Sequence, residues 1–302
     1  TLDYLFSLGE VDNKTPYREY YSSIYWSLSY LITKIFSSKY QIEISHLINL
    51  SFSLCTIFGI GKLSKELFNS KVGKITFLIL FFYPIFFGHM SFNSKDTILA
   101  FSHLWIAYLL LRYFKKQNIV HKRNKYVILL AVLAALATGI QLVFLGSLIP
   151  FFLFFLFEIF IFKKFINQEF SKSKLLYDLT KSFIIFYSIL ILFWIDTHPN
   201  IFILPYNFIT EMYSDNLITG WPYNLINGNY YLSREIPKNY FLINFLFKSP
   251  EYFLITYAFF IILFLKSKRF FHKKFEFFNY KLILIISILI FPTITLLSLI
   301  SI

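Results

Sequence analysis

The residues best suited to chemistry lie in a short polar segment, 84–96, between two long apolar runs. Its second half sets the imidazole of His89, the amide of Asn93, the ammonium of Lys95 and the carboxylate of Asp96 within eight residues. Ionisable groups at the border of an apolar segment commonly mark a functional site. A carboxylate can orient or deprotonate a hydroxyl, and an ammonium can stabilise the negative charge on a departing phosphate.

Each of these side chains also has a simpler structural role open to it. Asp96 precedes a predicted helix and could satisfy free N–H groups in its first turn. Lys95 could extend along apolar surface to reach lipid headgroups, and His89 could form hydrogen bonds at the membrane interface. Asn93 could close the turn through its own side chain. The sequence leaves these structural roles open beside the chemical ones.

Composition and charge place the chain among integral membrane proteins. Hydrophobic residues make up 57% of the 302 residues, and the mean hydropathy is +0.61, outside the soluble globular range. The net charge of +13 needs no nucleic-acid partner, because 21 of the 29 Lys and Arg residues lie in four loops, at 62–74, 112–125, 163–181 and 266–281. Basic residues in short loops mark the cytoplasmic side of a membrane protein. We therefore expect the four loops to share that side.

The apolar runs predict an all-α fold, a polytopic integral membrane helix bundle of about eight transmembrane helices with interfacial helices and loops on its outer face. Residues 126–157 carry no charge and are too long for one straight crossing, so we expect a helical hairpin that turns near 138–141. Glu158 is expected at the membrane interface rather than in catalysis. The other expected spans are 43–61, 75–88 with a kink at Pro84, 97–111, 182–195, 252–265, and one from Leu282 onward.

We expect a single transmembrane domain over 1–302, truncated at both ends. Its parts are a first outer segment (1–42), transmembrane helices (43–195) with the outer turn 88–96, an outer loop (196–251), and further transmembrane helices (252–302). The outer loop holds five of the nine prolines and many aromatic residues. That composition predicts a structured cap of short interfacial helices and turns that partly covers a cavity.

This layout resembles that of the GT-C glycosyltransferases, polytopic enzymes that use polyprenyl-phosphate sugars and include protein O-mannosyltransferases and the lipid A aminoarabinose transferase. The most specific similarity is the segment 84–96, which reads P-x-x-x-G-H-x-x-x-N-x-K-D. Weaker similarities are Thr138-Gly139, His198-Pro199, and Pro237-Lys238-Asn239-Tyr240 followed by Ser249-Pro250.

The resemblance implies an inverting transfer of a hexose or pentose from a lipid-linked sugar donor to a lipid, glycan or protein acceptor. The reaction would take place at the periplasmic face of a bacterial inner (plasma) membrane. In it, Asp96 would orient the acceptor or Lys95, and Lys95 would face the donor phosphate. The family's catalytic carboxylate usually follows the first transmembrane helix, so we expect it either to be missing from this sequence or to lie near Asp3, with Glu10, Asp12 and Glu19 as alternatives.

The expected substrate-binding residues are His89, Asn93, Arg18, Arg234 and Lys238. No cofactor is expected besides the donor substrate. No metal is expected either, because the ammonium of Lys95 beside a single carboxylate opposes a divalent cation.

Two other functions remain open on the sequence. A transporter or flippase for a lipid-linked or small polar substrate would hold charges or broken helices near the middle of the bilayer, whereas this chain keeps its charges at the ends of its spans. His46, His103 and Gln141 lie deeper and are expected to be helix-packing contacts. A purely structural membrane subunit gives no reason for the polar composition of 88–96.

Overall fold

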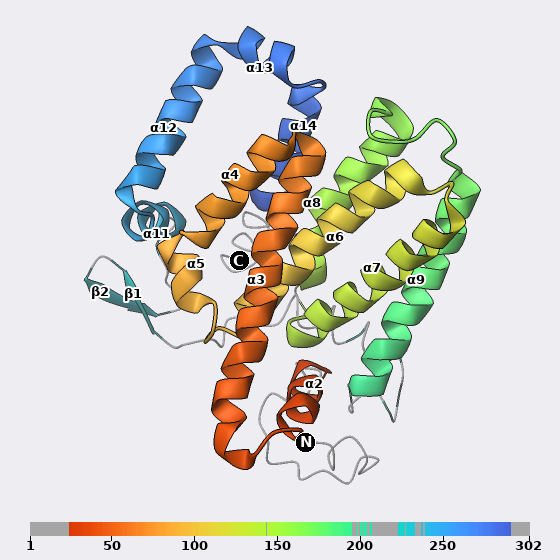
Figure 1. Cartoon of the computed structure of the whole chain (residues 1–302), viewed down its shortest axis with the longest axis vertical. Helices are drawn as coiled ribbons and strands as arrows, with labels where there is room; N and C mark the ends of the chain where they lie inside the picture. The colour runs from red at the N-terminus through yellow and green to blue at the C-terminus, as the bar shows by residue number, and fades with distance from the viewer. Residues whose placement is uncertain are drawn as a thin grey trace.

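The computed structural model shows a bundle of α-helices with one short β-hairpin (Figure 1). It describes residues 24–142, 144–194, 198, 200, 202–203, 206, 223–226, 228–232, 237 and 239–290, and every structural statement below concerns these residues. The predicted helical character is confirmed. The candidates Asp3, Arg18, Arg234 and Lys238 lie outside the described residues.

Five helical segments are long and apolar enough to cross a membrane. They are α3 (Gln41–Leu67), α6 (Asp96–Lys116), α7 (Val120–Ile140), α8 (Phe144–Phe157) continued by the π-helix Glu158–Phe162, and α9 (Lys172–Phe193). A sixth candidate is the pair α11 (Tyr240–Lys248) and α12 (Glu251–Lys266), which bends by 116° at a short break. The predicted hairpin is confirmed, because α7 ends at Ile140 and α8 begins at Phe144.

The expected count of about eight spans is not reached by the described residues. The expected span 75–88 is broken into α4 (Ser70–Phe81) and α5 (Pro84–His89). Tyr83 is extended, with φ −77° and ψ 112°, because the ring of a following proline disfavours the helical conformation. At 1.5 Å per residue α4 is only about 18 Å long, well short of the hydrocarbon layer.

The remaining helical elements are also short. They are α2 (Ile24–Thr33), a 3₁₀ turn (Ser38–Tyr40), α13 (Lys268–Lys274), α14 (Phe278–Ile285) and a π-helix (Ile286–Ile290). The last expected span, from Leu282 onward, is described only to Ile290, and the apolar helix found there, Phe278–Leu289, is likewise too short to cross a membrane by itself.

The outer surface of the bundle is strongly apolar. On α12, for example, Ile255 and Phe259 are more than 60% exposed, and Leu192 on α9 is 62% exposed. Apolar surface on this scale is unfavourable in water and is normal against lipid. Together with the long apolar helices, it indicates a membrane-embedded protein.

The largest buried cluster lies where α6, α7 and α8 meet the end of α3. Phe114 of α6 stacks on Phe155 of α8 with ring centroids 4.6 Å apart. α3 and α4 cross closely at two glycines, because a Cβ added to Gly73 would lie 2.7 Å from the carbonyl oxygen of Gly61. Small residues permit such close helix contacts in membranes.

The four basic loops meet at one end of the bundle, the upper end in Figure 1. Glu66 accepts hydrogen bonds from Arg112 and Lys115, each at 2.9 Å, which joins the first loop to the second. Asn118 donates to Glu169 at 2.6 Å, which joins the second to the third. Two aromatic contacts join the fourth loop to the others: Phe162, just before the third loop, packs against Tyr280, and Phe68 of the first loop packs against Phe275. We call this the basic end; that it faces the cytoplasm stays a prediction.

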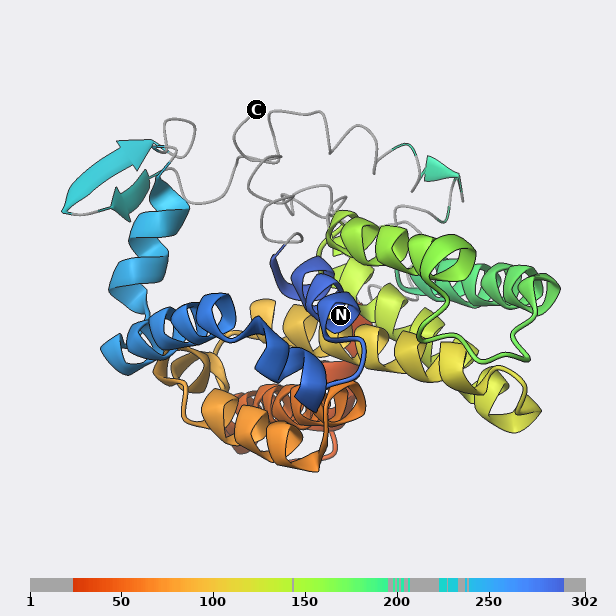
Figure 2. The ribbon, with the colours of Figure 1, turned by 90° about the horizontal axis from the view of Figure 1, so that it is seen from above.

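The predicted outer loop contains a β-hairpin where only helices and turns were expected. Strands β1 (Tyr223–Ile226) and β2 (Asn229–Leu232) pair antiparallel, with Ile226 opposite Asn229. Gly228, with φ 81°, adopts the left-handed conformation that such a tight turn requires. The hairpin lies beside α11 (Figures 1 and 2), so this part of the chain has more regular structure than its proline content suggested.

Candidate functional site

The polar turn between α5 and α6 is fastened to α3. The carbonyl oxygen of Met90 accepts hydrogen bonds from Asn49 at 3.1 Å and from Ser53 at 2.8 Å. The hydroxyl of Thr97, at the start of α6, lies 2.8 Å from the side-chain oxygen of Asn49 and also contacts the carbonyl of Asn93. Asn49, Ser53 and Thr97 are all buried. These bonds fix the position of the turn relative to two long helices.

Asn93 and Asp96 close the turn by bonding to each other. The backbone N–H of Asp96 donates to Asn93 Oδ1 at 3.0 Å, and Asn93 Nδ2 donates to Asp96 Oδ2 at 2.8 Å. The first bond satisfies the free backbone N–H of the first residue of α6, and the second joins the two side chains. This geometry supports the structural role of Asn93 directly and gives Asp96 a structural role as well. The Asp96 side chain is exposed and does not line the cavity described next.

Lys95 lines a cavity of about 210 Å³, which we call the turn cavity. Its other walls come from α2 and from the last turn of α7. The lining residues are Tyr25, Trp26, Ser94, Lys95, Gly139 and Ile140. Of these six residues, Lys95 alone carries a charge, so the cavity is suited to an anionic group. The structure thus brings Gly139, part of the weak Thr138-Gly139 similarity, next to the strongest motif.

A second hollow of about 320 Å³ shares Tyr25, Trp26 and Ser94 with the turn cavity and continues along α3. Its wall on α3 is polar and includes Gln41, Ser45 and Asn49. His46 also lines it, with its ring against Phe92 at a centroid distance of 5.0 Å. His46 was expected as a deep packing contact, but it instead faces a hollow able to take a polar ligand.

Tyr25 forms the boundary between the two hollows. Its side chain is only 4% exposed. Burial raises the pKa of the Tyr25 phenol, and a hydrogen bond with Ser94 partly offsets that rise. The phenol is therefore neutral at physiological pH and can serve as a hydrogen-bond donor beside Lys95.

The other described candidates stand apart from the cavity. His89 is the last residue of α5 and is exposed. His103 is half-buried in α6 with Nε2 2.8 Å from the carbonyl oxygen of Ile288, a contact between helices of the expected kind. Glu158 is fully buried within the protein. It accepts a hydrogen bond from the backbone N–H of Phe165 and so holds the loop after α8.

A buried polar cluster near the basic end was not anticipated. Asp178 of α9 is only 3% exposed and accepts a hydrogen bond from the hydroxyl of Tyr113 at 2.7 Å. Arg123 of α7 lies 3.5 Å from the same carboxylate oxygen. Gln117 donates to the hydroxyl of Tyr113 at 3.0 Å and also binds the backbone of Ser171. The cluster ties α6, α7 and α9 together.

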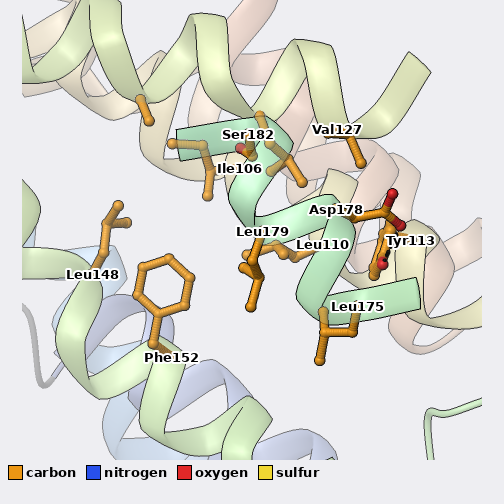
Figure 3. Close-up of a pocket in the computed structure, with 12 residues that line it drawn as sticks. Ile106, Leu110, Tyr113, Val127, Leu148, Phe152, Leu175, Asp178, Leu179 and Ser182 are labelled. Atoms are coloured by element: carbon orange, nitrogen blue, oxygen red, sulfur yellow. Dashed lines mark hydrogen bonds between the residues drawn. The ribbon is translucent and has the colours of Figure 1, made fainter. Parts of the chain in front are cut away.

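Asp178 and Tyr113 stand side by side at one end of a cavity of about 110 Å³ (Figure 3). The rest of the cavity is lined mainly by aliphatic side chains of α6, α7, α8 and α9. The sequence placed Asp178 in a basic loop because it lies between Lys174 and Lys181. The signal that could have found it is the helical spacing that sets Asp178 on the same face as Leu175 and Ser182.

The described residues contain no group of three or more His, Cys, Asp or Glu side chains placed to hold a metal ion. Comparisons with family models, curated proteins and solved structures found no match. The chemical reading of the site therefore rests on the geometry around Lys95.

Proposed function

We propose that this chain is the membrane part of a glycosyltransferase that transfers a sugar from a polyprenyl-phosphate donor to an acceptor. The observation that carries the proposal is the position of Lys95. It lines a cavity at the opposite end of the bundle from the four basic loops, on a turn held by buried hydrogen bonds. A lipid-linked donor needs just such a place, where a phosphate can meet a cation at the border of an apolar bundle.

In this proposal Lys95 stabilises the departing phosphate. Negative charge on the phosphate grows as its bond to the sugar breaks, and a cation already held in position costs no reorganisation at that moment. The neutral phenol of Tyr25 and the hydroxyl of Ser94 supply hydrogen bonds beside it. The adjoining hollow along α3 offers amide, hydroxyl and imidazole groups for sugar hydroxyls.

The acceptor hydroxyl also needs a base. Asp96 is bonded to Asn93 outside the turn cavity, so its proposed part is to orient the turn that carries Lys95. The base would then be an acid of the first outer segment, with Asp3 as the candidate. Arg18, Arg234 and Lys238 remain proposed substrate contacts, and the chemistry is proposed to be inverting and independent of a metal.

The proposal includes a location. The basic end would lie in the cytoplasm and the turn cavity at the periplasmic face of a bacterial inner membrane. The count of eight crossings would be completed by α4 with α5 and by the segment that begins with α14.

A donor-turnover assay tests this function. The chain is reconstituted in liposomes with a panel of polyprenyl-phosphate hexoses and pentoses, and release of polyprenyl phosphate is measured. Lys95→Ala should lower turnover by about 100-fold, as loss of a charge-stabilising group typically does. Lys39→Ala is the matched control, because Lys39 is an exposed lysine just before α3 that lines neither hollow. Equal turnover in wild type and Lys95→Ala would refute the proposal.

Two further measurements separate the roles within the site. Asp96→Asn should also reduce turnover by about 100-fold if the carboxylate holds the turn where Lys95 must be, and unchanged turnover would show that the turn keeps its position without that charge. Binding of polyprenyl phosphate alone, followed by native mass spectrometry, should weaken in Lys95→Ala. Donor movement across the membrane without sugar transfer would instead favour a flippase.

A further inference from the structure

A groove between α3 and α4 combines lysines with exposed apolar side chains. Its volume is about 510 Å³. The lining residues are Phe58, Gly61, Lys62, Lys65, Ser70, Gly73, Lys74, Phe77 and Leu78. We call it the α3–α4 groove. It belongs to the basic end and is separate from the turn cavity, which the proposed function uses.

The backbone geometry explains why three lysines converge there. Lys62 and Lys65 are three residues apart in the last turns of α3 and so lie on one face. α4 crosses that face at Gly73, where an added Cβ would lie 2.8 Å from the Cβ of Lys65. Lys74 follows Gly73 directly, so it enters the groove from the opposite wall.

None of the residues that line the groove is acidic. The nearest acid in the sequence is Glu66, and both of its oxygens are taken by Arg112 and Lys115 at 2.9 Å. None of the groove lysines forms a salt bridge within the described part of the chain. Lys62 lies over the ring of Trp105 at 5.0 Å, which holds its stem against the helix.

The apolar part of the groove lies deeper along the helices. Phe58 is seven residues before Lys65 in α3, about 10 Å along the axis. Phe58 and Phe77 are in ring contact at 5.2 Å, and Phe58 and Leu78 are 55% and 50% exposed. Figures 1 and 2 show α3 and α4 side by side, and in Figure 2 they lie at the lower edge of the molecule. Cationic groups thus stand at the end of the span, and exposed apolar groups stand about two turns further in.

We propose that the α3–α4 groove binds an anionic phospholipid of the bilayer, with its phosphate among Lys62, Lys65 and Lys74 and an acyl chain along Phe58 and Leu78. Basic pockets between membrane helices on the cytoplasmic side are suited to such headgroups. The start of α4 adds a favourable dipole, because Ser70 is its first residue and also lines the groove. The arrangement matches an amphiphile in both charge and depth.

Native mass spectrometry of the purified chain tests the site. The protein is mixed with phosphatidylglycerol and phosphatidylcholine of identical acyl chains, and the retained lipid is counted. The wild type should keep one phosphatidylglycerol in preference. Lys65→Gln with Lys74→Gln should reduce that preference by about 30-fold, from two lysines near an anionic headgroup. Both side chains are exposed, so the double variant should fold.

The matched control is Lys71→Gln with Lys174→Gln. It removes the same charge from the same end, from two exposed lysines that do not line the groove. Retention in this control should equal that of the wild type. Equal losses in both double variants would show that overall charge alone attracts the lipid and would overturn the site. Displacement of the lipid by soluble glycerol 3-phosphate at millimolar concentration would show that the groove binds a phosphate without needing the acyl chains. That result would also overturn the proposed lipid site.

Discussion

Removing the Asp178 carboxylate should be among the most damaging single changes to stability in this chain. Asp178→Ala takes away the acceptor for the Tyr113 hydroxyl, at 2.7 Å, and the counterion of Arg123, at 3.5 Å. The side chains of Asp178 and Arg123 are only 3% and 14% exposed. Breaking a buried ion pair by deleting one partner typically costs about 3 to 5 kcal/mol. Arg123 keeps a little access to solvent, so we expect a loss of about 3 kcal/mol in the free energy of unfolding.

The measurement is an SDS titration of the detergent-solubilised protein, followed by tryptophan fluorescence. Asp178→Ala with Arg123→Met removes both charges and should recover at least half of the lost free energy, because no unpaired charge then stays buried. Glu169→Ala is the control, since its bond to Asn118 lies at an exposed position and should cost about 0.5 kcal/mol or less. The reasoning is refuted if Asp178→Ala costs less than about 1 kcal/mol, or if the double variant costs the sum of the two single ones.

Three other perturbations follow from the packing and from the site. Gly73→Val should destabilise the chain by about 2 kcal/mol in the same titration, because its Cβ would lie 2.7 Å from the Gly61 carbonyl; Gly88→Ala, with nothing within 4 Å of the added Cβ, should be nearly neutral. Asn49→Ala should lower the free energy of unfolding by about 1 to 3 kcal/mol, because it leaves buried polar groups unpaired. Donor turnover that depends on Lys95 should fall as well, and normal turnover would show that the turn holds its position without Asn49. The phenol of Tyr25 should ionise above the ordinary tyrosine pKa of 10.0. The stability gained from keeping it protonated is therefore present below pH 10 and is lost as pH rises through the higher folded-state pKa. The difference in absorbance at 295 nm between wild type and Tyr25→Phe reports this ionisation, and a midpoint at or below pH 10 contradicts the prediction.

Much of the architecture follows from patterns in the sequence. The uncharged run 126–157 predicted the α7–α8 hairpin, because no single crossing can be that long. The four basic loops were expected on one side, and their hydrogen bonds and ring contacts place them at one end. These features rest on length and charge, which the sequence states directly.

The features that were missed have two causes: local signals that were given too little weight, and contacts between distant segments. The break between α4 and α5 follows from Pro84, but the sequence was expected to give only a kink there. The β-hairpin was missed although Asn227-Gly228 is a strong turn signal. Asp178 looked like one more loop charge, because its partners come from α6 and α7.

The candidate site shows the same division. The segment around Lys95 stands out by its residue types, and Asn93 was expected to close the turn, as it does. Tyr25 and Gly139 line the cavity because of tertiary packing, which the local sequence around them does not predict. Asp96, the strongest candidate by type, lies outside the cavity because its bond to Asn93 holds it at the helix start.

The attachment of the polar turn to α3 makes the depth of Lys95 in the bilayer a property of that helix. α3 has 27 residues, about 40 Å in length, whereas the hydrocarbon layer is about 30 Å thick. A helix longer than the layer adjusts by tilting, and its tilt changes with lipid thickness. Since Asn49 and Ser53 hold the Met90 carbonyl, the turn must travel with α3 as it leans. The reach of the Lys95 ammonium toward a headgroup is thereby tied to the thickness of the surrounding membrane.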